Sequence, residues 1–371
     1  MNQWNAPFRY DYVGSFLRPD FLKKARSEFE QGTIGRAELT AVEDRAIREL
    51  VSQQKAAGYH AITDGEFRRA TWHLDFMWGF DGVAHEPTRT GLPFHHEAAM
   101  IDDTYLTGRI SVGRHPFVDH FRFVKALEDE NTVARQTLPS PAQFLLQMIM
   151  PVNAERTRAV YPDTEELVQD LVRGYRRVLS DLYDEGCRNI QLDDCTWGMF
   201  VDPNALNIFQ TDEAGLKKIM ELFLRINNLA IEGKPADLAL NTHICRGNFH
   251  STWACSGGYD AVAEYVLAQE KVDAFYLEFD DERSGGFEPL AAVPSDKKVV
   301  LGLITSKSPV LEEKEKVIAR IREAEKYLPL DRLCLSPQCG FASCEIGNKL
   351  TAEEQWNKLR LVREIAQEVW G

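Results

Sequence analysis

The chain has 371 residues, 44% of them hydrophobic, and a formal net charge of −14 at pH 7. This length supports a complete hydrophobic core, and the acidic balance without a basic patch excludes nucleic acid and anionic membranes as expected partners. No run of 18 apolar residues predicts a transmembrane helix, and the polar start Met1–Arg9 lacks the apolar core of an export signal. We therefore expect a cytoplasmic protein whose seven widely spread cysteines are reduced thiols.

Short β-rich runs alternate with longer amphipathic segments along the chain. The predicted strands, in chain order, are Tyr10–Ser15, His60–Asp64, Val133–Pro139, Asn189–Asp193, Leu238–Cys245, Asp273–Phe279, Lys298–Thr305 and Leu333–Cys339. The predicted helices between them include Thr164–Glu185, Thr211–Ile231, Tyr259–Gln269 and Pro309–Lys326. This alternation predicts an α/β fold in which helices cover a parallel sheet.

Eight strands can close into a (β/α)8 TIM barrel or form an open doubly wound sheet. No Gly-x-Gly-x-x-Gly motif follows the first strand, which weakens the open nucleotide-binding alternative. Polar residues gather at or just past the ends of the predicted strands, where such a barrel has its active face. They are Ser15, Glu66, Asp193, His243, Cys245, Glu278 and Cys339. We therefore predict one barrel domain over residues 1–371, with an insertion at about 68–131, after the second strand, that caps the barrel mouth.

His243 and Cys245 carry the clearest chemical signal. They are two residues apart on a predicted strand, so their side chains share one face, and imidazole nitrogen with thiolate sulfur is a typical start of a zinc site. Glu278 and Cys339 end two other predicted strands and would complete a set of one nitrogen, two sulfurs and one oxygen. These residues also have structural interpretations without a metal. A histidine on a strand can be a buried polar residue with its own hydrogen-bond partners, and a glutamate can cap a helix or pair with a cation. The other cysteines are interpreted as small buried hydrophobic residues, namely Cys187, Cys195, Cys255, Cys334 and Cys344.

Several motifs resemble those of the cobalamin-independent methionine synthase family, in the family order from about residue 10 to 345. They are Val13-Gly14-Ser15-Phe16, Asp64-Gly65-Glu66-Phe67, Ile190-Gln191-Leu192-Asp193-Asp194, Thr242-His243-Ile244-Cys245, Glu278 and Pro337-Gln338-Cys339-Gly340. The resemblance implies a TIM barrel that holds Zn²⁺ through His243, Cys245, Glu278 and Cys339. It also implies that Ser15 binds the carboxylate of homocysteine, and that Glu66 and Asp193 bind its ammonium group.

The sequence departs from the family at three points. Full-length members have two barrels, and this chain has the length of one, matching the catalytic C-terminal half. Thr305-Ser306-Lys307-Ser308-Pro309 stands where the family usually has Asp-Ile-His-Ser-Pro, so Lys307 replaces a histidine proposed to protonate the departing folate. Lys307 could act as that acid, bind an anionic donor, or be a solvated lysine at a strand end. Thr137-Leu138-Pro139-Ser140-Pro141 replaces Leu-Thr-Gly-Pro.

These features predict a zinc-dependent methyltransferase of methionine biosynthesis that converts homocysteine to methionine. The expected methyl donor is a methyltetrahydrofolate or another methyl carrier. The oligomeric state is left open, with a homodimer as one option. One alternative is zinc-dependent alkyl transfer from an epoxide to another small thiol, for which Lys307 could bind a sulfonate. Another is a metal-binding or regulatory protein without catalysis, which the complete ligand set and both carboxylates disfavour.

Overall fold

The computed structural model describes residues 5–371, so the first four residues of the segment examined for an export signal lie outside it. Its largest sheet has six parallel strands in the order β12-β11-β10-β9-β8-β7. These strands are β7 (Gln136–Pro139), β8 (Asn189–Asp194), β9 (Ala239–Ile244), β10 (Ala274–Glu278), β11 (Lys298–Ile304) and β12 (Leu333–Pro337). Five of them were predicted from the sequence to within two residues, whereas the predicted strand Val133–Pro139 is divided into β6 (Val133–Ala134) and β7. Each of the six pairs with its neighbour in chain order. The parallel α/β fold is therefore confirmed.

Two further segments extend this sheet at its edges. β1 (Ala61–Ile62) pairs in parallel with β6 (Val133–Ala134), which leads into β7. At the other edge, Tyr10 forms a single parallel bridge with Leu335 of β12. The predicted strand Tyr10–Ser15 is thus wrong in extent, because Gly14 turns the backbone to a φ of 147°. One backbone hydrogen bond, from Phe16 N to Gly65 O at 3.1 Å, joins this segment to the loop after β1, and no ladder between the two is found in residues 5–371.

A buried ion pair crosses the interior between the strands. Arg135, between β6 and β7, lies 2.9 Å from the carboxylate of Asp11. The hydroxyl of Tyr276 on β10 donates to the same carboxylate at 2.8 Å. These contacts connect the first segment with the middle of the sheet, where backbone pairing alone does not.

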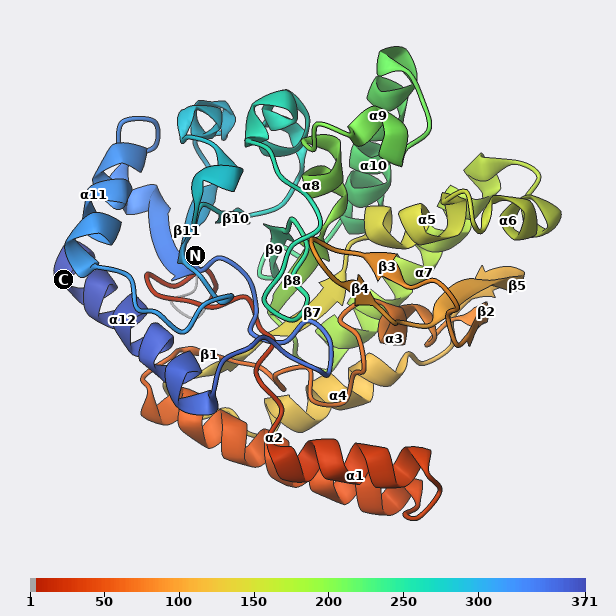
Figure 1. Cartoon of the computed structure of the whole chain (residues 1–371), viewed down its shortest axis with the longest axis horizontal. Coiled ribbons are helices and arrows are strands. Elements are labelled where there is room, and N and C mark those ends of the chain that lie inside the picture. The colour runs from red at the N-terminus through yellow and green to blue at the C-terminus, as the bar shows by residue number, and fades with distance from the viewer. Residues whose placement is uncertain (1–4) are drawn as a thin grey trace.

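Helices surround the strands in the view of Figure 1. They are α1 (Asp20–Glu30), α2 (Arg36–Ala56), α3 (Leu74–Met77), α4 (Pro116–Lys125), α5 (Pro141–Ile149), α6 (Ala154–Val160), α7 (Thr164–Asp184), α8 (Thr196–Phe200), α9 (Ala205–Ile208), α10 (Glu213–Ile231), α11 (Lys314–Ala324) and α12 (Ala352–Trp370). Short 3-10 turns are η1 (Tyr259–Ala261), η3 (Glu282–Ser284), η4 (Glu288–Ala292) and η5 (Leu330–Arg332), and η2 (Ala263–Leu267) is a π-helix. Across the described part of the chain, no helix has the length and apolar character needed to cross a membrane.

The predicted helices agree with the structure where capping is strong and differ elsewhere. α7 begins as predicted, since the Asp163 side chain accepts from Glu165 N. The predicted helix Tyr259–Gln269 is helical in the structure, as the 3-10 turn η1 followed by the π-helix η2. α11 begins five residues later than predicted, because Glu312 accepts from Thr305 N and pairs with Lys358, each at 2.9 Å, which keeps this stretch a loop.

Residues 68–131 form structure of their own between β1 and β6. β2 (Asp81–Glu86) pairs antiparallel with β5 (Asp103–Ser111), and β3 (Leu92–Pro93) forms a small hairpin with β4 (Ala98–Ala99). α3 and α4 flank these strands in the sequence. The β3–β4 hairpin contributes side chains to a cavity at the carboxyl ends of the central strands.

Candidate metal centre

The predicted site residues lie where parallel strands end. Asp193 is near the end of β8, His243 is in β9, and Cys245 directly follows β9. Glu278 is the last residue of β10, and Cys339 follows β12 by two residues. Because neighbouring parallel strands end at the same edge, these side chains can meet although they are far apart in the sequence.

Three of them form a compact group of soft ligand atoms. The ligand atoms of His243, Cys245 and Cys339 all lie within 4.8 Å of one another, and all three residues are buried. The two Sγ atoms are 3.7 Å apart, which matches the separation of about 3.8 Å expected for two thiolates bound tetrahedrally to zinc. His243 Nδ1 lies 3.2 Å from the carbonyl of Tyr276, and its buried Nε2 has no hydrogen-bond partner among residues 5–371. The imidazole is therefore oriented to offer Nε2 to a metal ion.

The charges around this group favour a cation at its centre. The hydrogen bond from Cys195 is the largest cause that lowers the pKa of Cys245 well below its usual range, and Cys339 and His243 add to it. Burial alone would lower the pKa of His243, but the Cys245 thiolate and the carboxylates of Asp193 and Glu278 raise it overall. An imidazole and a thiolate beside a second thiol suit a soft divalent ion such as Zn²⁺.

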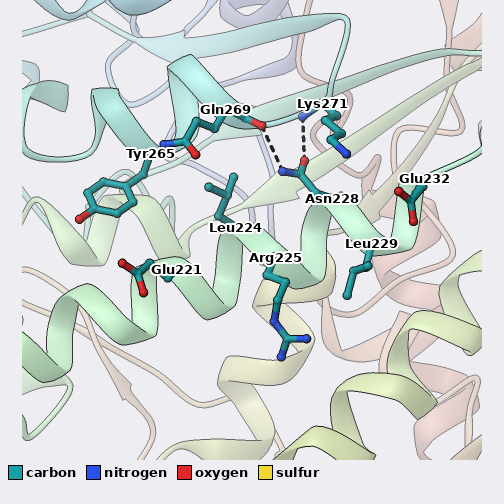
Figure 2. Close-up of a pocket in the computed structure, with 9 residues that line it drawn as sticks. All are labelled: Glu221, Leu224, Arg225, Asn228, Leu229, Glu232, Tyr265, Gln269 and Lys271. Atoms are coloured by element: carbon teal, nitrogen blue, oxygen red, sulfur yellow. Dashed lines mark hydrogen bonds between the residues drawn. The ribbon is translucent and has the colours of Figure 1, made fainter.

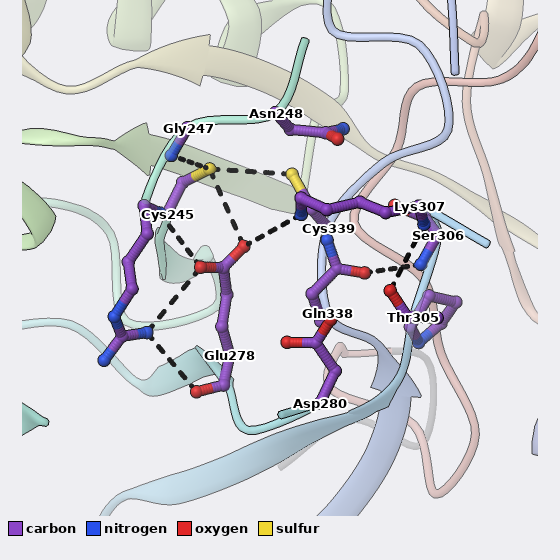
Figure 3. Close-up of polar contacts among 12 residues, drawn as sticks. Cys245, Gly247, Asn248, Glu278, Asp280, Thr305, Ser306, Lys307, Gln338 and Cys339 are labelled. Carbon is purple, nitrogen blue, oxygen red and sulfur yellow. Dashed lines mark hydrogen bonds and ion pairs between the residues drawn. The ribbon is translucent and has the colours of Figure 1, made fainter. Parts of the chain in front are cut away.

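Glu278 lies beside this group and is held by cations (Figure 3). Its Oε1 is 3.9 Å from the Cys245 sulfur and 3.9 Å from Lys307 Nζ. Its Oε2 accepts from the backbone N–H of Arg246 at 3.0 Å and lies 3.6 Å from the Arg246 guanidinium. Burial, with the Cys245 thiolate, raises the pKa of Glu278 to about 7, against the lowering effect of Lys307 and Arg246. The carboxylate is thus close enough to join the donor set by a small movement, and it has cations that can hold it when it does not.

Lys307 faces Glu278 and does not line the cavity described below. Its side chain is 8% exposed, and its Nζ makes no hydrogen bond to any described residue. This location favours a role toward Glu278 over the predicted roles of proton donor to a leaving group or partner of an anionic donor.

A cavity of about 590 Å³ opens beside the metal group and contains the other predicted binding residues. Ser15, Glu66 and Asp193 all line it. Glu66 follows the turn after β1 with a φ of 63°, a strained conformation for a non-glycine residue. Its Oε1 contacts Arg69 at 3.2 Å and Thr137 at 2.9 Å, whereas its buried Oε2 has no hydrogen-bond partner in the described chain. This oxygen is available to an ammonium group in the cavity.

Asp193 is the second carboxylate of this end of the cavity. Gln191 Nε2 donates to its Oδ1 at 2.8 Å. Burial raises the pKa of Asp193 to about 7, and the charge on Glu66 adds to this while His243 opposes it. A cationic substrate group between Glu66 and Asp193 would relieve the repulsion of the two carboxylates.

Sequence reasoning missed Cys195 as a site residue. It lines the cavity and donates to Cys245, which lowers the pKa of that thiol. Strand alternation gives no signal for it, because β8 ends at Asp194 and Cys195 has helical backbone angles at the start of α8. Arg246 and Asn248 were also missed, since they lie in the loop after β9, where no periodicity indicates direction.

A second pocket, of about 440 Å³, lies on the surface between α10 and the segment after η2 (Figure 2). Asn228 connects its two sides, donating to Gln269 O at 3.1 Å and accepting from Lys271 N at 2.8 Å. Its lining has no histidine or cysteine. It therefore offers no site for thiol chemistry.

Comparison with known proteins identifies the relatives of this arrangement. The family model described as cobalamin-independent synthase, catalytic domain, matches residues 150–368, a range that includes all the metal-group residues. The chain belongs to the cobalamin-independent synthase family. The family's activity places the chain among enzymes of the methionine synthase type, which are methyltransferases.

Relatives of the same length support this membership. The chain is 41% identical to the uncharacterized protein YxjH of Bacillus subtilis, over 99% of this chain and 96% of YxjH. A methionine synthase of Pyrococcus abyssi is 24% identical over 96% of this chain and 92% of its own length. A solved structure from Listeria monocytogenes, of a putative vitamin-B12 independent methionine synthase, is 35% identical, covers 99% of both chains and has a TM-score of 0.77. A B12-independent methionine synthase from Shewanella sp. W3-18-1, solved with selenomethionine, shares the fold at a TM-score of 0.70 and 19% identity.

Proposed function

We propose that this protein is a zinc-dependent methyltransferase that transfers a methyl group to the thiol of homocysteine to give methionine. The observation that supports this most is one cavity that joins the soft-ligand group to two carboxylates, Glu66 and Asp193. The thiol of homocysteine would bind at the soft-ligand group, and its α-ammonium group would bind at the two carboxylates.

His243, Cys245 and Cys339 would hold the zinc ion, with Glu278 completing the donor set before substrate binds. When bound, zinc lowers the pKa of a substrate thiol and keeps its sulfur nucleophilic at neutral pH. Glu66 and Asp193 would hold the ammonium group, and Ser15 would bind the carboxylate. Lys307 and Arg246 would neutralise Glu278 where it is not a zinc ligand, so that no unpaired buried carboxylate is left.

In the alternative of epoxide transfer to another small thiol, Lys307 was considered as the partner of a sulfonate group. Lys307 does not line the cavity, and the two carboxylates there disfavour an anionic substrate. The closed eight-stranded barrel, the cap formed by residues 68–131, the cytoplasmic location and a homodimer remain predictions.

The test measures methionine formed from homocysteine by zinc-loaded protein with a panel of methyl donors. Binding of homocysteine is compared with that of 3-mercaptopropionate and 2-mercaptoethanesulfonate, which lack the amino group. We expect homocysteine to bind most tightly. Equal or tighter binding of the sulfonate thiol would contradict the assignment of Glu66 and Asp193, and absence of product with every donor would contradict the methyltransferase proposal.

A further inference from the structure

Apart from the metal group and the acidic residues, the cavity is lined mainly by apolar side chains. Its wall combines the β3–β4 hairpin with the segments that follow β7 and β8, through Leu92, Phe94, Ile101, Leu146, Met150 and Met199. The aromatic ring of Trp72 also lines it, stacked on His73 with centroids 4.5 Å apart. A second molecule beside the thiol would meet this surface.

The charge of the cavity is negative. Its lining has three carboxylates, Glu66, Asp193 and Asp202, and one cationic side chain, Arg246. The Arg246 guanidinium is already engaged, with Gly257 O at 2.7 Å and the Tyr259 hydroxyl at 2.8 Å. An anionic group in this cavity would therefore find no free cation among the lining residues.

Asp202 lines the cavity with a carboxylate that the backbone holds in place. Its two carboxylate oxygens accept from the backbone N–H groups of Ser256 and Asn204, each at 2.9 Å. These bonds keep the carboxylate in position on the cavity wall. A cavity whose lining combines carboxylates with the aromatic side chains of Trp72 and Phe94 is an environment that attracts an organic cation.

The β3–β4 hairpin limits the size of what can enter. His95 N donates to Trp253 O at 2.7 Å, and Glu97 contacts both His250 and Lys349 at 2.7 Å. Phe94 lies close to Gly247 in the loop after β9, because an added Cβ at Gly247 would be 3.0 Å from its ring. The hairpin is thus fastened over the loop that carries Cys245, and the cavity of about 590 Å³ must hold the thiol substrate as well.

From this combination we infer that the methyl donor is a small organic cation of the onium class, a methylsulfonium or a quaternary methylammonium. This inference rests on the proposed methyl transfer to homocysteine. The thiolate sulfur forms a bond to the methyl carbon while the bond from that carbon to the onium centre breaks. The electron pair of the broken bond stays on the leaving group, which departs as a neutral thioether or tertiary amine. This step needs no proton donor. His73 in the cavity lining agrees with this, because burial lowers its pKa to about 3 and the ring is uncharged at neutral pH.

Binding of the cation is tested first, with a probe that does not report turnover. Calorimetry on the zinc-loaded protein with homocysteine present compares tetramethylammonium with the neutral molecule tert-butanol. We expect tetramethylammonium to bind more tightly. Asp202→Asn should weaken it about threefold or more, and Trp72→Leu should do so by a similar factor.

The control is Asp184→Asn, which removes the same charge from an exposed position at the end of α7, outside the cavity lining. It should leave the affinity unchanged. Equal binding of the cation and the neutral probe, or an equal effect of both aspartate substitutions, would overturn the inference.

Donor use is tested second, with deuterated methyl groups and detection of labelled methionine. The donors are S-methylmethionine, glycine betaine and a polyglutamylated methyltetrahydrofolate, which separate sulfonium, ammonium and anionic folate. We expect labelled product from one or both onium donors. Product from the folate alone would overturn this inference and leave the proposed function standing.

Homocysteine binding is followed independently in cobalt-substituted protein through its thiolate-to-metal absorption band. A band without product from any donor would overturn both the onium inference and the methyltransferase proposal, while keeping the thiol site. Loss of the band in Glu66→Gln but not in Asp202→Asn would show that Glu66 and Asp202 bind different molecules, as we infer.

Discussion

Glu270 offers a direct test of how burial controls charge in this fold. The residue follows η2 and is fully buried, and its Oε1 accepts from Asn227 Nδ2 at 3.0 Å. The same amide donates to Asp194 at 3.0 Å, and Glu270 Oε2 has no partner among the described residues. Burial, with the nearby charge of Asp194, raises the pKa of Glu270 to about 8 from its ordinary 4.5. Glu270 is therefore protonated in the folded protein at neutral pH.

The sign of the effect on stability follows from this difference. Between pH 4.5 and 8 the unfolded chain has lost the Glu270 proton while the folded chain keeps it, so unfolding releases a proton and stability falls as the pH rises. The slope is at most about 1.4 kcal/mol per pH unit, so the ceiling between pH 5.5 and 8.5 is about 3 kcal/mol. Glu270→Gln keeps the acceptor for Asn227 and removes the titration.

The assay is denaturant unfolding of both proteins, with equal zinc content, at pH 5.5 and 8.5. The variant should gain stability relative to the parent at the higher pH, by up to about 3 kcal/mol. Glu264→Gln, on the exposed side of η2, is the matched control and should not change the pH dependence. If Glu270→Gln has the same pH dependence as the parent, Glu270 ionises in the ordinary range and the argument from burial is refuted.

Three further predictions concern the site. Cys339→Ser should strongly reduce zinc content measured by metal analysis, because a hydroxyl is a poor replacement for a thiolate, while Cys334→Ala, in the core of β12, should retain zinc; equal zinc in Cys339→Ser and the parent would remove Cys339 from the site. Glu66→Gln should weaken homocysteine binding by about 10- to 100-fold, the range of one charge-assisted hydrogen bond, and leave 3-mercaptopropionate unaffected; equal losses for both thiols would contradict contact with the ammonium group. Lys307→Met should raise KM for homocysteine more than it lowers kcat, because Glu278 then lacks one of its two cations; a change in kcat alone, with a shifted pH profile, would instead indicate the proton-donor role.

The sequence by itself determined the residues of the metal group. His243 and Cys245 share a face because strand side chains alternate, and Cys339 reaches the same edge because parallel strands end together. The six strands of the central sheet were equally readable, since each is a short buried run between turn residues. Cys195 was not recognised, because it follows the end of β8 with helical backbone angles, where alternation no longer indicates direction.

Only the tertiary structure decided the roles around that group. Glu278 was predicted as a ligand from its strand end, but its position between Arg246 and Lys307 depends on loops whose directions have no periodicity. The orientation of Lys307 toward Glu278 could not be read from a motif, because a single residue after a strand can face either side. The β3–β4 hairpin reaches the site through Phe94 and Glu97, about 150 residues from their partners in the loop after β9. Contacts between residues so far apart in the sequence depend on the packing of the whole fold. These contacts determine which second molecule can reach the thiol.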